Sequence, residues 1–278
     1  MLGRTLVREL ADGFDMIATD LPEADITDAE CIDAVFAKYA PDAVIHCAAM
    51  TAVDKCESER ELAFRLNETG SANVAVACSR RGIRLIAIST DYVFDGDADR
   101  PYGESDIPTG GRTVYGQSKF AGEEAVRRLC PDHVIARISW LYGSGGPSFV
   151  HAMMSLADVS RPVLKVVADQ HGNPTSATAV ARALKGILLR PELRGTFHLT
   201  CEGEATWSDF AEEIFRLAGI GQKVQRCTTN EFPRPAPRPK NSSLDKAALR
   251  LAGLPPMPYW KDALAEFMEA EFPHKDKQ

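Results

Sequence analysis

Three short apolar runs constrain the fold of this chain more than any other feature. They lie at residues 43–47, 85–88 and 134–138. Apolar residues follow one another within each run, which is typical of a strand buried on both faces in a parallel sheet. Segments with helical periodicity, at about 59–81 and from Tyr115 onward, separate the runs. The alternation predicts an α/β fold, in which a parallel sheet carries helices on both faces.

The rhythm of strands and helices changes after about Tyr142, where a Gly- and Pro-rich loop follows. We expect residues 1–142 and 176–200 to form a dinucleotide-binding domain, because the second range has the pattern of a helix and a strand that return to the sheet. We expect residues 143–175 and 201–278 to form a smaller α/β substrate-binding domain.

Local signals predict three further elements. Residues 16–19 have the composition of a short strand. Thr27 with Glu30 has the spacing of a capping box that opens a helix. Thr206 is expected to cap a helix over residues 207–217.

The composition excludes several classes of partner. The 278 residues carry a formal net charge of −7, and no run of Lys or Arg occurs, so neither nucleic acid nor an anionic membrane is expected. No apolar run is long enough to cross a bilayer, and the first residues lack a signal-peptide pattern, so we expect a cytoplasmic protein. The seven cysteines form no Cys-x-x-Cys pair, and the histidines lack metal-ligand spacing. We expect free thiols and no metal site.

Two stretches carry groups suited to proton transfer. Ser89 and Thr90 end one apolar run, and Tyr115 precedes Lys119 by four residues, so the phenol and the ammonium share one helix face. A phenol has a pKa near ~10, and a nearby ammonium is expected to lower it toward neutrality. Either hydroxyl could hold a substrate oxygen against the phenol. A Tyr-x-x-x-Lys pair is common by chance, so its weight depends on the rest of the chain.

Further motifs supply that context. They occupy residues 24–28, 48–57, 67, 89–96, 115–123, 137–143, 169–175 and 238–245. With these motifs the chain resembles the extended short-chain dehydrogenase/reductases, and more narrowly the dTDP-4-dehydrorhamnose reductases. The resemblance covers nearly the whole chain and implies a Rossmann-like doubly wound parallel sheet with a smaller α/β substrate-binding domain.

The resemblance implies hydride transfer from NADPH or NADH to the C4 ketone of a dTDP-linked sugar, dTDP-4-dehydro-β-L-rhamnose. Tyr115 would protonate the developing alkoxide, and Lys119 would lower the pKa of Tyr115 and hold the nicotinamide ribose. Thr90 matches the catalytic hydroxyl of the family. Substrate contacts are expected from Ser89, Asp91, Trp140 and Arg238, with Trp140 beside the sugar and Arg238 on the diphosphate.

Besides Tyr115 and Lys119, cofactor contacts are expected from two further parts of the chain. Asp20 could accept a hydrogen bond from the adenosine ribose, which favours NADH, although the family tolerates both cofactors. Asp25 and Ile26 match residues near the adenine. Small residues at the carboxyl edge of the sheet let the backbone approach the cofactor, and these are Ala48, Ala49 and Thr51.

The beginning of the chain departs from the family pattern. Gly3 matches the last glycine of a Gly-x-x-Gly-x-x-Gly turn that receives the dinucleotide pyrophosphate. We therefore expect roughly ten residues, a strand and most of the turn, to precede Met1 in the native protein. Cofactor binding would be weak without them. N-terminal mass spectrometry of the native protein tests this expectation.

Two alternative functions remain open from the sequence. A nucleotide-sugar epimerase or dehydratase would use the same Tyr and Lys but keep its NAD bound through the cycle. A non-catalytic regulatory subunit, like that of methionine adenosyltransferase, would share the fold without turnover. A homodimer is compatible with either alternative and with the reductase.

Overall fold

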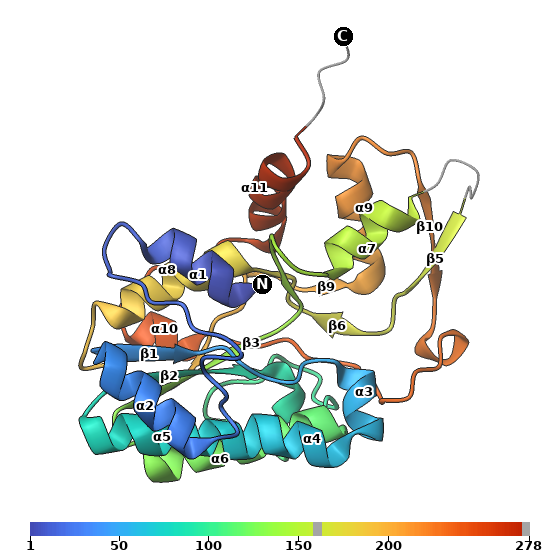
Figure 1. Ribbon diagram of the computed structural model, residues 1–278. Helices are drawn as coiled ribbons and strands as arrows, with labels where there is room; N and C mark the ends of the chain where they lie inside the picture. Colours follow the sequence, from blue (N-terminus) through green and yellow to red (C-terminus); the bar gives the residue numbers. More distant parts are fainter. Residues whose placement is uncertain (158–162, 274–278) are drawn as a thin grey trace.

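The structure is a computed structural model that describes residues 1–157 and 163–273. Its centre is a sheet of four parallel strands in the order β1-β2-β3-β8 (Figure 1). These strands are β1 (Ala43–His46), β2 (Arg84–Thr90), β3 (His133–Ile138) and β8 (Gly195–His198). The three strands predicted from the apolar runs are thereby confirmed.

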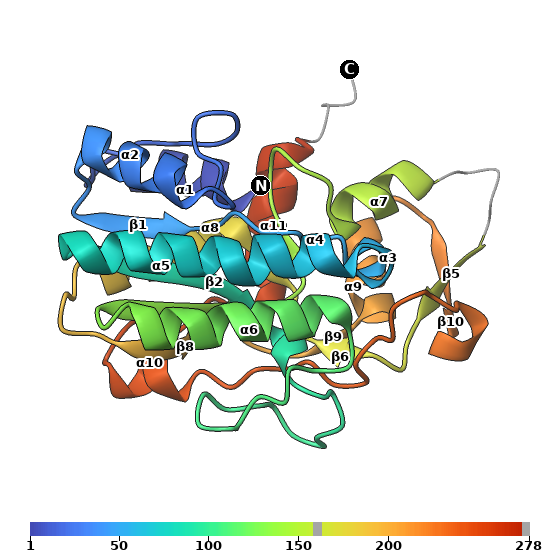
Figure 2. The ribbon, with the colours of Figure 1, turned by 60° about the horizontal axis from the view of Figure 1, so that its bottom comes forward.

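Helices cover both faces of this sheet. Figure 2 shows α5 (Gly70–Arg81) and α6 (Val114–Leu129) over one face. Helix α2 (Ala29–Tyr39) packs against α5 in the same hydrophobic core. On the other face, α1 (Leu2–Leu10) packs against α8 (Ala177–Leu188), as Figure 1 shows. The predicted α/β architecture, with helices on both faces of a parallel sheet, is confirmed.

Side chains of β2 alternate between two hydrophobic cores. Leu85 and Ala87 pack with the core of α2 and α5, whereas Ile86 and Ile88 pack with that of α1 and α8. Successive side chains of a strand point to opposite faces, so an apolar residue at every position buries both faces. Burial on both faces of the sheet therefore explains the continuous apolar run at 85–88.

The connection from β1 to α5 is a series of short helical segments. These are α3 (Val53–Ser58), α4 (Arg60–Phe64) and a π-helical turn (Arg65–Thr69) that leads into α5. The helix predicted over 59–81 is thus present but interrupted by the π turn, and Gly82 ends it at a φ of 65°. A π turn shifts the helical register by one residue and often occurs at a functional site.

A second group of elements lies beyond the carboxyl ends of β1, β2 and β3 (Figure 1). Three two-stranded sheets pair β5 with β10, β4 with β7 and β6 with β9, and α7, α9 and α11 pack around them. Their bounds are β4 (Leu141–Tyr142), α7 (Phe149–Leu156), β5 (Val163–Val167), β6 (His171–Gly172), β7 (Thr175–Ser176), β9 (Ala205–Thr206), α9 (Trp207–Leu217), β10 (Lys223–Cys227) and α11 (Trp260–Glu271). Helix α10 (Ala247–Leu251) instead lies against β8 of the central sheet.

One continuous hydrophobic core joins this second group to the central sheet. Leu6 of α1 and Leu184 of α8 belong to the same cluster as Phe210 of α9 and Leu264 of α11. Helix α9 begins after Thr206, whose side chain accepts a hydrogen bond from the Asp209 backbone N–H at 3.1 Å. The predicted Thr206 cap is confirmed.

Two local predictions near the N-terminus are wrong. Residues 16–19 are not a strand, because no described strand forms a hydrogen-bonded ladder with them. Helix α2 is capped by Asp28, not Thr27, since Asp28 Oδ1 accepts from the N–H groups of Glu30 and Cys31 at 2.9 and 3.1 Å. The Thr27 hydroxyl donates to Asp25 instead.

Within residues 1–157 and 163–273, no helix has both the length and the apolar character that a membrane crossing requires.

The shared core predicts a large cost for truncating Leu264, which is fully buried. Leu264→Ala removes buried methyl groups and leaves a cavity, so its unfolding free energy should fall by about 2–5 kcal/mol. Leu251→Ala is the matched control, because that side chain is 88% exposed and its change should stay within about 0.5 kcal/mol. Urea unfolding followed by circular dichroism measures both, and equal losses would contradict the shared core.

Candidate active site

Several of the predicted site residues gather where β1, β2 and β3 end. Ala48 and Ala49 follow β1, Thr90 ends β2, and Trp140 follows β3. Parallel strands bring their carboxyl ends to one edge of the sheet, which is where open α/β sheets bind ligands. The edge therefore unites groups from three separate parts of the chain.

Helix α6 places Tyr115 against this edge. The Thr113 side chain caps the helix by accepting from the Gly116 N–H at 2.9 Å. A Cβ at Gly116 would come within 2.2 Å of the Tyr92 carbonyl oxygen, so glycine permits the close approach of the first turn. The Tyr115 ring packs edge-on against Tyr92, with ring centroids 5.5 Å apart.

The Tyr115 phenol is buried and neutral. Burial raises its pKa, and a hydrogen bond with the Thr90 hydroxyl only partly opposes that effect. The expected lowering of this pKa by Lys119 is not what the structure shows, because the Lys119 ammonium donates to the Ile88 carbonyl at 2.8 Å. Removal from water disfavours the phenolate more than the neighbouring groups favour it. A neutral phenol still holds the proton that a developing alkoxide requires.

Thr90 and Asp91 form a buried pair beside the phenol. The Thr90 hydroxyl donates to Asp91 Oδ1 at 2.9 Å and accepts from the Tyr92 N–H at 3.2 Å. The Tyr115 phenol is a further partner of the Thr90 hydroxyl, and this hydrogen bond favours the phenolate. Burial raises the pKa of Asp91 to about 6, against the opposing effect of the Ser242 and Thr90 hydroxyls.

Ser89 lies next to Thr90, but its hydroxyl bonds a different residue. Its buried hydroxyl donates to Glu123 Oε1 at 2.5 Å. The sequence left open which of the two hydroxyls lies against the phenol, and the structure places Thr90 there. A substrate contact from Ser89 stays a prediction.

Asn67 holds the loop that follows β1. Its Oδ1 accepts from the Met50 N–H at 2.8 Å, and its Nδ2 donates to the Met50 carbonyl at 3.1 Å and to Ser118 Oγ at 2.9 Å. One buried amide therefore joins the loop of Ala48, Ala49 and Thr51 to helix α6. Sequence reasoning missed this role, because it depends on the π turn that points Asn67 inward.

The remaining predicted cofactor residues lie in or after α1. Gly3 is exposed in the first turn, and a Cβ there would meet nothing within 4 Å. Asp20 is exposed and accepts from the Leu21 N–H at 2.8 Å. Asp25 Oδ1 accepts from the Thr27 N–H at 2.9 Å, and Ile26 is buried in the core beside α2.

Trp140 is held firmly at the border between the sheet and the second group of elements. Its backbone adopts a φ of 44°, which is uncommon for a bulky residue. Its ring stacks on Trp207, with centroids 3.6 Å apart and planes 7° apart. A Cβ at Gly172 would lie 2.5 Å from the Trp140 ring, so glycine is required there.

Arg238 lies in the Pro-rich segment, near Tyr92. Its Nη2 lies 2.9 Å from Asp54 Oδ1, and its Nη1 donates to the Ala236 carbonyl at 3.0 Å. Asp54 also accepts from the Ala236 N–H at 3.2 Å, which attaches this segment to α3.

All seven cysteines are free thiols. Among the residues that the structure describes, no three His, Cys, Asp or Glu side chains are grouped as metal ligands.

Comparison with known proteins places this geometry in a family. The family model named RmlD substrate binding domain matches residues 1–272. The chain belongs to the RmlD substrate binding domain family. The extended match confirms the resemblance inferred from the motifs.

Several named reductases are similar to this chain over nine tenths or more of their own length. A dTDP-4-dehydrorhamnose reductase from Streptomyces griseus is 43% identical, over 97% of this chain and 90% of its own. The crystal structure of a dTDP-4-dehydrorhamnose reductase from Clostridium acetobutylicum is also 43% identical, covers 97% of this chain and 95% of its own, and has a TM-score of 0.93. That of the Bacillus anthracis reductase, in complex with NADP, is 39% identical with the same coverages and TM-score. The predicted Rossmann-like fold is confirmed.

Asn67 should matter for both stability and cofactor affinity. Asn67→Ala removes three buried hydrogen bonds, so the unfolding free energy should fall by about 1–3 kcal/mol and NADPH affinity several-fold. Fluorescence titration with NADPH and urea unfolding measure the two effects. Thr69→Ala is the control, because Thr69 is exposed in the same π turn. Wild-type NADPH affinity in a folded Asn67→Ala variant would contradict this role.

Proposed function

We propose that this protein reduces dTDP-4-dehydro-β-L-rhamnose to dTDP-β-L-rhamnose with NADPH or NADH, the last step of dTDP-rhamnose biosynthesis. The observation that carries the proposal is the buried contact of Tyr115 with Thr90 at the carboxyl edge of the sheet, with Lys119 on the same helix. The whole-length similarity to dTDP-4-dehydrorhamnose reductases supports the choice of substrate.

The residues at the sheet edge fit a nicotinamide dinucleotide. Ala48 and Thr51 are small and exposed after β1, and the space around Gly3 is open at the N-terminus of α1. Exposed N–H groups at such a helix end suit a pyrophosphate. The structure of the Bacillus anthracis relative is in complex with NADP, which supports a nicotinamide dinucleotide as the cofactor. The cofactor, when bound, supplies the hydride that reaches C4 of the sugar.

Tyr115 supplies the proton that the reduction requires. The neutral phenol donates its proton to the sugar O4 as the C4 ketone becomes an alcohol, so one hydride and one proton complete the reduction. Thr90, whose hydroxyl also bonds Asp91, keeps the phenol in place by a hydrogen bond. Lys119 holds the nicotinamide ribose and provides a positive charge for the phenolate that remains.

We assign the sugar nucleotide to the part of the site that Trp140, Ser89, Asp91 and Arg238 form. Trp140 flanks the sugar, and Ser89 and Asp91 complete its surroundings near Thr90. Arg238 binds the diphosphate, for which it must exchange its ion pair with Asp54 for the phosphate oxygens. In this division residues 1–142 and 176–200 hold the cofactor, and residues 143–175 and 201–278 hold the substrate.

The two alternatives have less support. A dehydratase generally places a second acid beside the Thr-Asp pair, whereas Tyr92 follows here. A non-catalytic subunit would not require a complete Thr90, Tyr115 and Lys119 set. Consumption of one NAD(P)H for each sugar reduced separates the reductase from an epimerase, and recovery of a synthetase partner without turnover would favour a subunit. A cytoplasmic location and a homodimer stay predictions.

Tyr115→Phe tests the assigned proton donor. The variant keeps the ring that packs on Tyr92 but lacks the acidic proton, so kcat with the keto sugar should fall by about a hundred- to ten-thousand-fold. The cofactor KM should change little. Tyr39→Phe is the matched control, because Tyr39 bonds Glu23 at an exposed position. A Tyr115→Phe enzyme with the wild-type kcat would contradict the assignment.

A further inference from the structure

Glu123 is a buried carboxylate that no part of the proposed reaction uses. It is 3% exposed and lies one helical turn beyond Lys119 on α6. Its Oε1 accepts from Ser89 at 2.5 Å and from Arg137 Nε at 2.9 Å, and its Oε2 accepts from Arg137 Nη2 at 2.7 Å. Arg127 on α6 adds a contact to Oε2 at 2.8 Å. The carboxylate thus ties the catalytic helix to the ends of β2 and β3.

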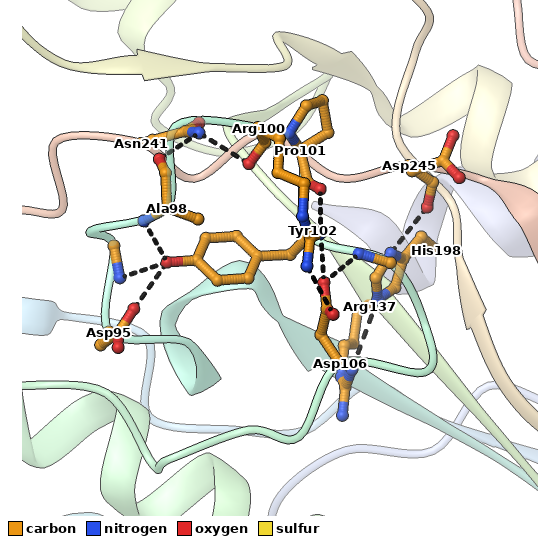
Figure 3. A network of polar contacts seen from close by, with 12 residues as sticks. Asp95, Ala98, Arg100, Pro101, Tyr102, Asp106, Arg137, His198, Asn241 and Asp245 are labelled. Carbon is orange, nitrogen blue, oxygen red and sulfur yellow. Dashed lines mark hydrogen bonds and ion pairs between the residues drawn. The ribbon is translucent and has the colours of Figure 1, made fainter.

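The network continues from Arg137 to the segment before α10. Figure 3 shows Arg137, His198 and the Asp245 backbone in series. The Asp245 carbonyl can only accept, so His198 Nδ1 donates to it at 2.7 Å and Nε2 accepts from Arg137 Nη1 at 3.3 Å. Burial, followed by the Arg137 charge, lowers the pKa of His198 to about 3, so the ring is neutral.

The cluster of Glu123, Arg137, Arg127 and Lys119 contains more positive than negative side chains. Burial alone would raise the pKa of Glu123, but the hydrogen bond and charge of Arg137, with Ser89 and Arg127, outweigh it and lower the pKa. One ionised carboxylate therefore faces two arginines and Lys119. A buried ion pair of this kind gives little net stability over apolar residues of similar size, so stability alone is a poor explanation for it.

Lys119 is the member of this cluster that takes part in the proposed reaction. It is 6% exposed, and burial lowers its pKa to about 8, with Glu123 and then Cys47 opposing that effect. His46, on β1, also lies near it, and burial lowers the pKa of His46 to about 3, which leaves a neutral ring. Glu123 is therefore the ionised carboxylate that acts on the Lys119 ammonium.

We propose that Glu123 is a positioning residue for Lys119: it anchors the catalytic helix to β2 and β3 and supplies the counter-charge that keeps the ammonium protonated. The proposal rests on the proposed function in one respect, because activity is assumed to require the charged form of Lys119. Loss of the carboxylate should let Lys119 lose its proton at a lower pH.

The test compares a variant that lacks both charges of the Glu123–Arg137 pair with a variant that keeps the carboxylate at position 123. Glu123→Gln alone leaves Arg137 buried without its partner and is expected to unfold easily, whereas Glu123→Gln/Arg137→Met removes both charges and should fold. Glu123→Asp keeps the charge on a shorter side chain. Glu124→Gln is the matched control, because Glu124 is the exposed neighbour that also pairs with Arg127.

Two measurements report the protonation of Lys119 in the wild-type protein and in these variants. Competitive labelling with acetic anhydride, read by mass spectrometry across pH, reports the protonation midpoint of Lys119 without any turnover. The alkaline limb of the kcat/KM profile with the keto sugar reports its effect on activity. Both midpoints should fall by about one to two pH units in the double variant and stay near wild type in Glu123→Asp and Glu124→Gln.

The outcomes separate the two proposals. A folded double variant with a wild-type labelling midpoint would make Glu123 a purely structural residue and overturn the inference. If wild-type protein did not reduce the keto sugar, the proposed function would fail, while the labelling midpoints would still decide the role of Glu123.

Discussion

The site depends on how β2 is held between β1 and β3. Its side chains alternate between two cores, so Leu85 and Ala87 face α2 and α5 while Ile86 and Ile88 face α1 and α8. A slip of one residue would exchange those faces and bury the wrong set. Ser89 continues the alternation of Leu85 and Ala87, and its hydroxyl reaches Glu123 on α6. Thr90 ends the strand, and its hydroxyl bonds Tyr115.

Burial then shifts the pKa of several titratable groups at the sheet edge. It raises the pKa of Tyr115 and of Asp91 and lowers that of Lys119. Glu123 escapes this trend because Arg137, Arg127 and Ser89 all donate to it. The result is a neutral phenol that can give a proton, and a negative charge on Glu123 that acts on the Lys119 ammonium. Both features suit reduction of a ketone.

The sequence predicted the parts of this structure that depend on local pattern. Apolar runs indicated β1, β2 and β3, and Thr206 indicated the start of α9, because double burial and helix capping leave direct marks on the sequence. The strand expected at 16–19 fails because strand formation needs a partner, which no local pattern reveals. Thr27 fails as a cap because its hydroxyl is used by Asp25 and the neighbouring Asp28 is available. The roles of Asn67 and Glu123 depend on a π turn and on contacts between distant segments, so the sequence could not reveal them.

The central claim is that a hydride and the Tyr115 proton convert the C4 ketone into an alcohol at this sheet edge. The most direct measurement is turnover of dTDP-4-dehydro-β-L-rhamnose with NADPH deuterated at the transferable C4 position, followed by NMR of the sugar product. We expect dTDP-β-L-rhamnose with one deuterium at sugar C4 and one cofactor oxidised for each product. Product without deuterium, or cofactor that is not consumed, would contradict the account.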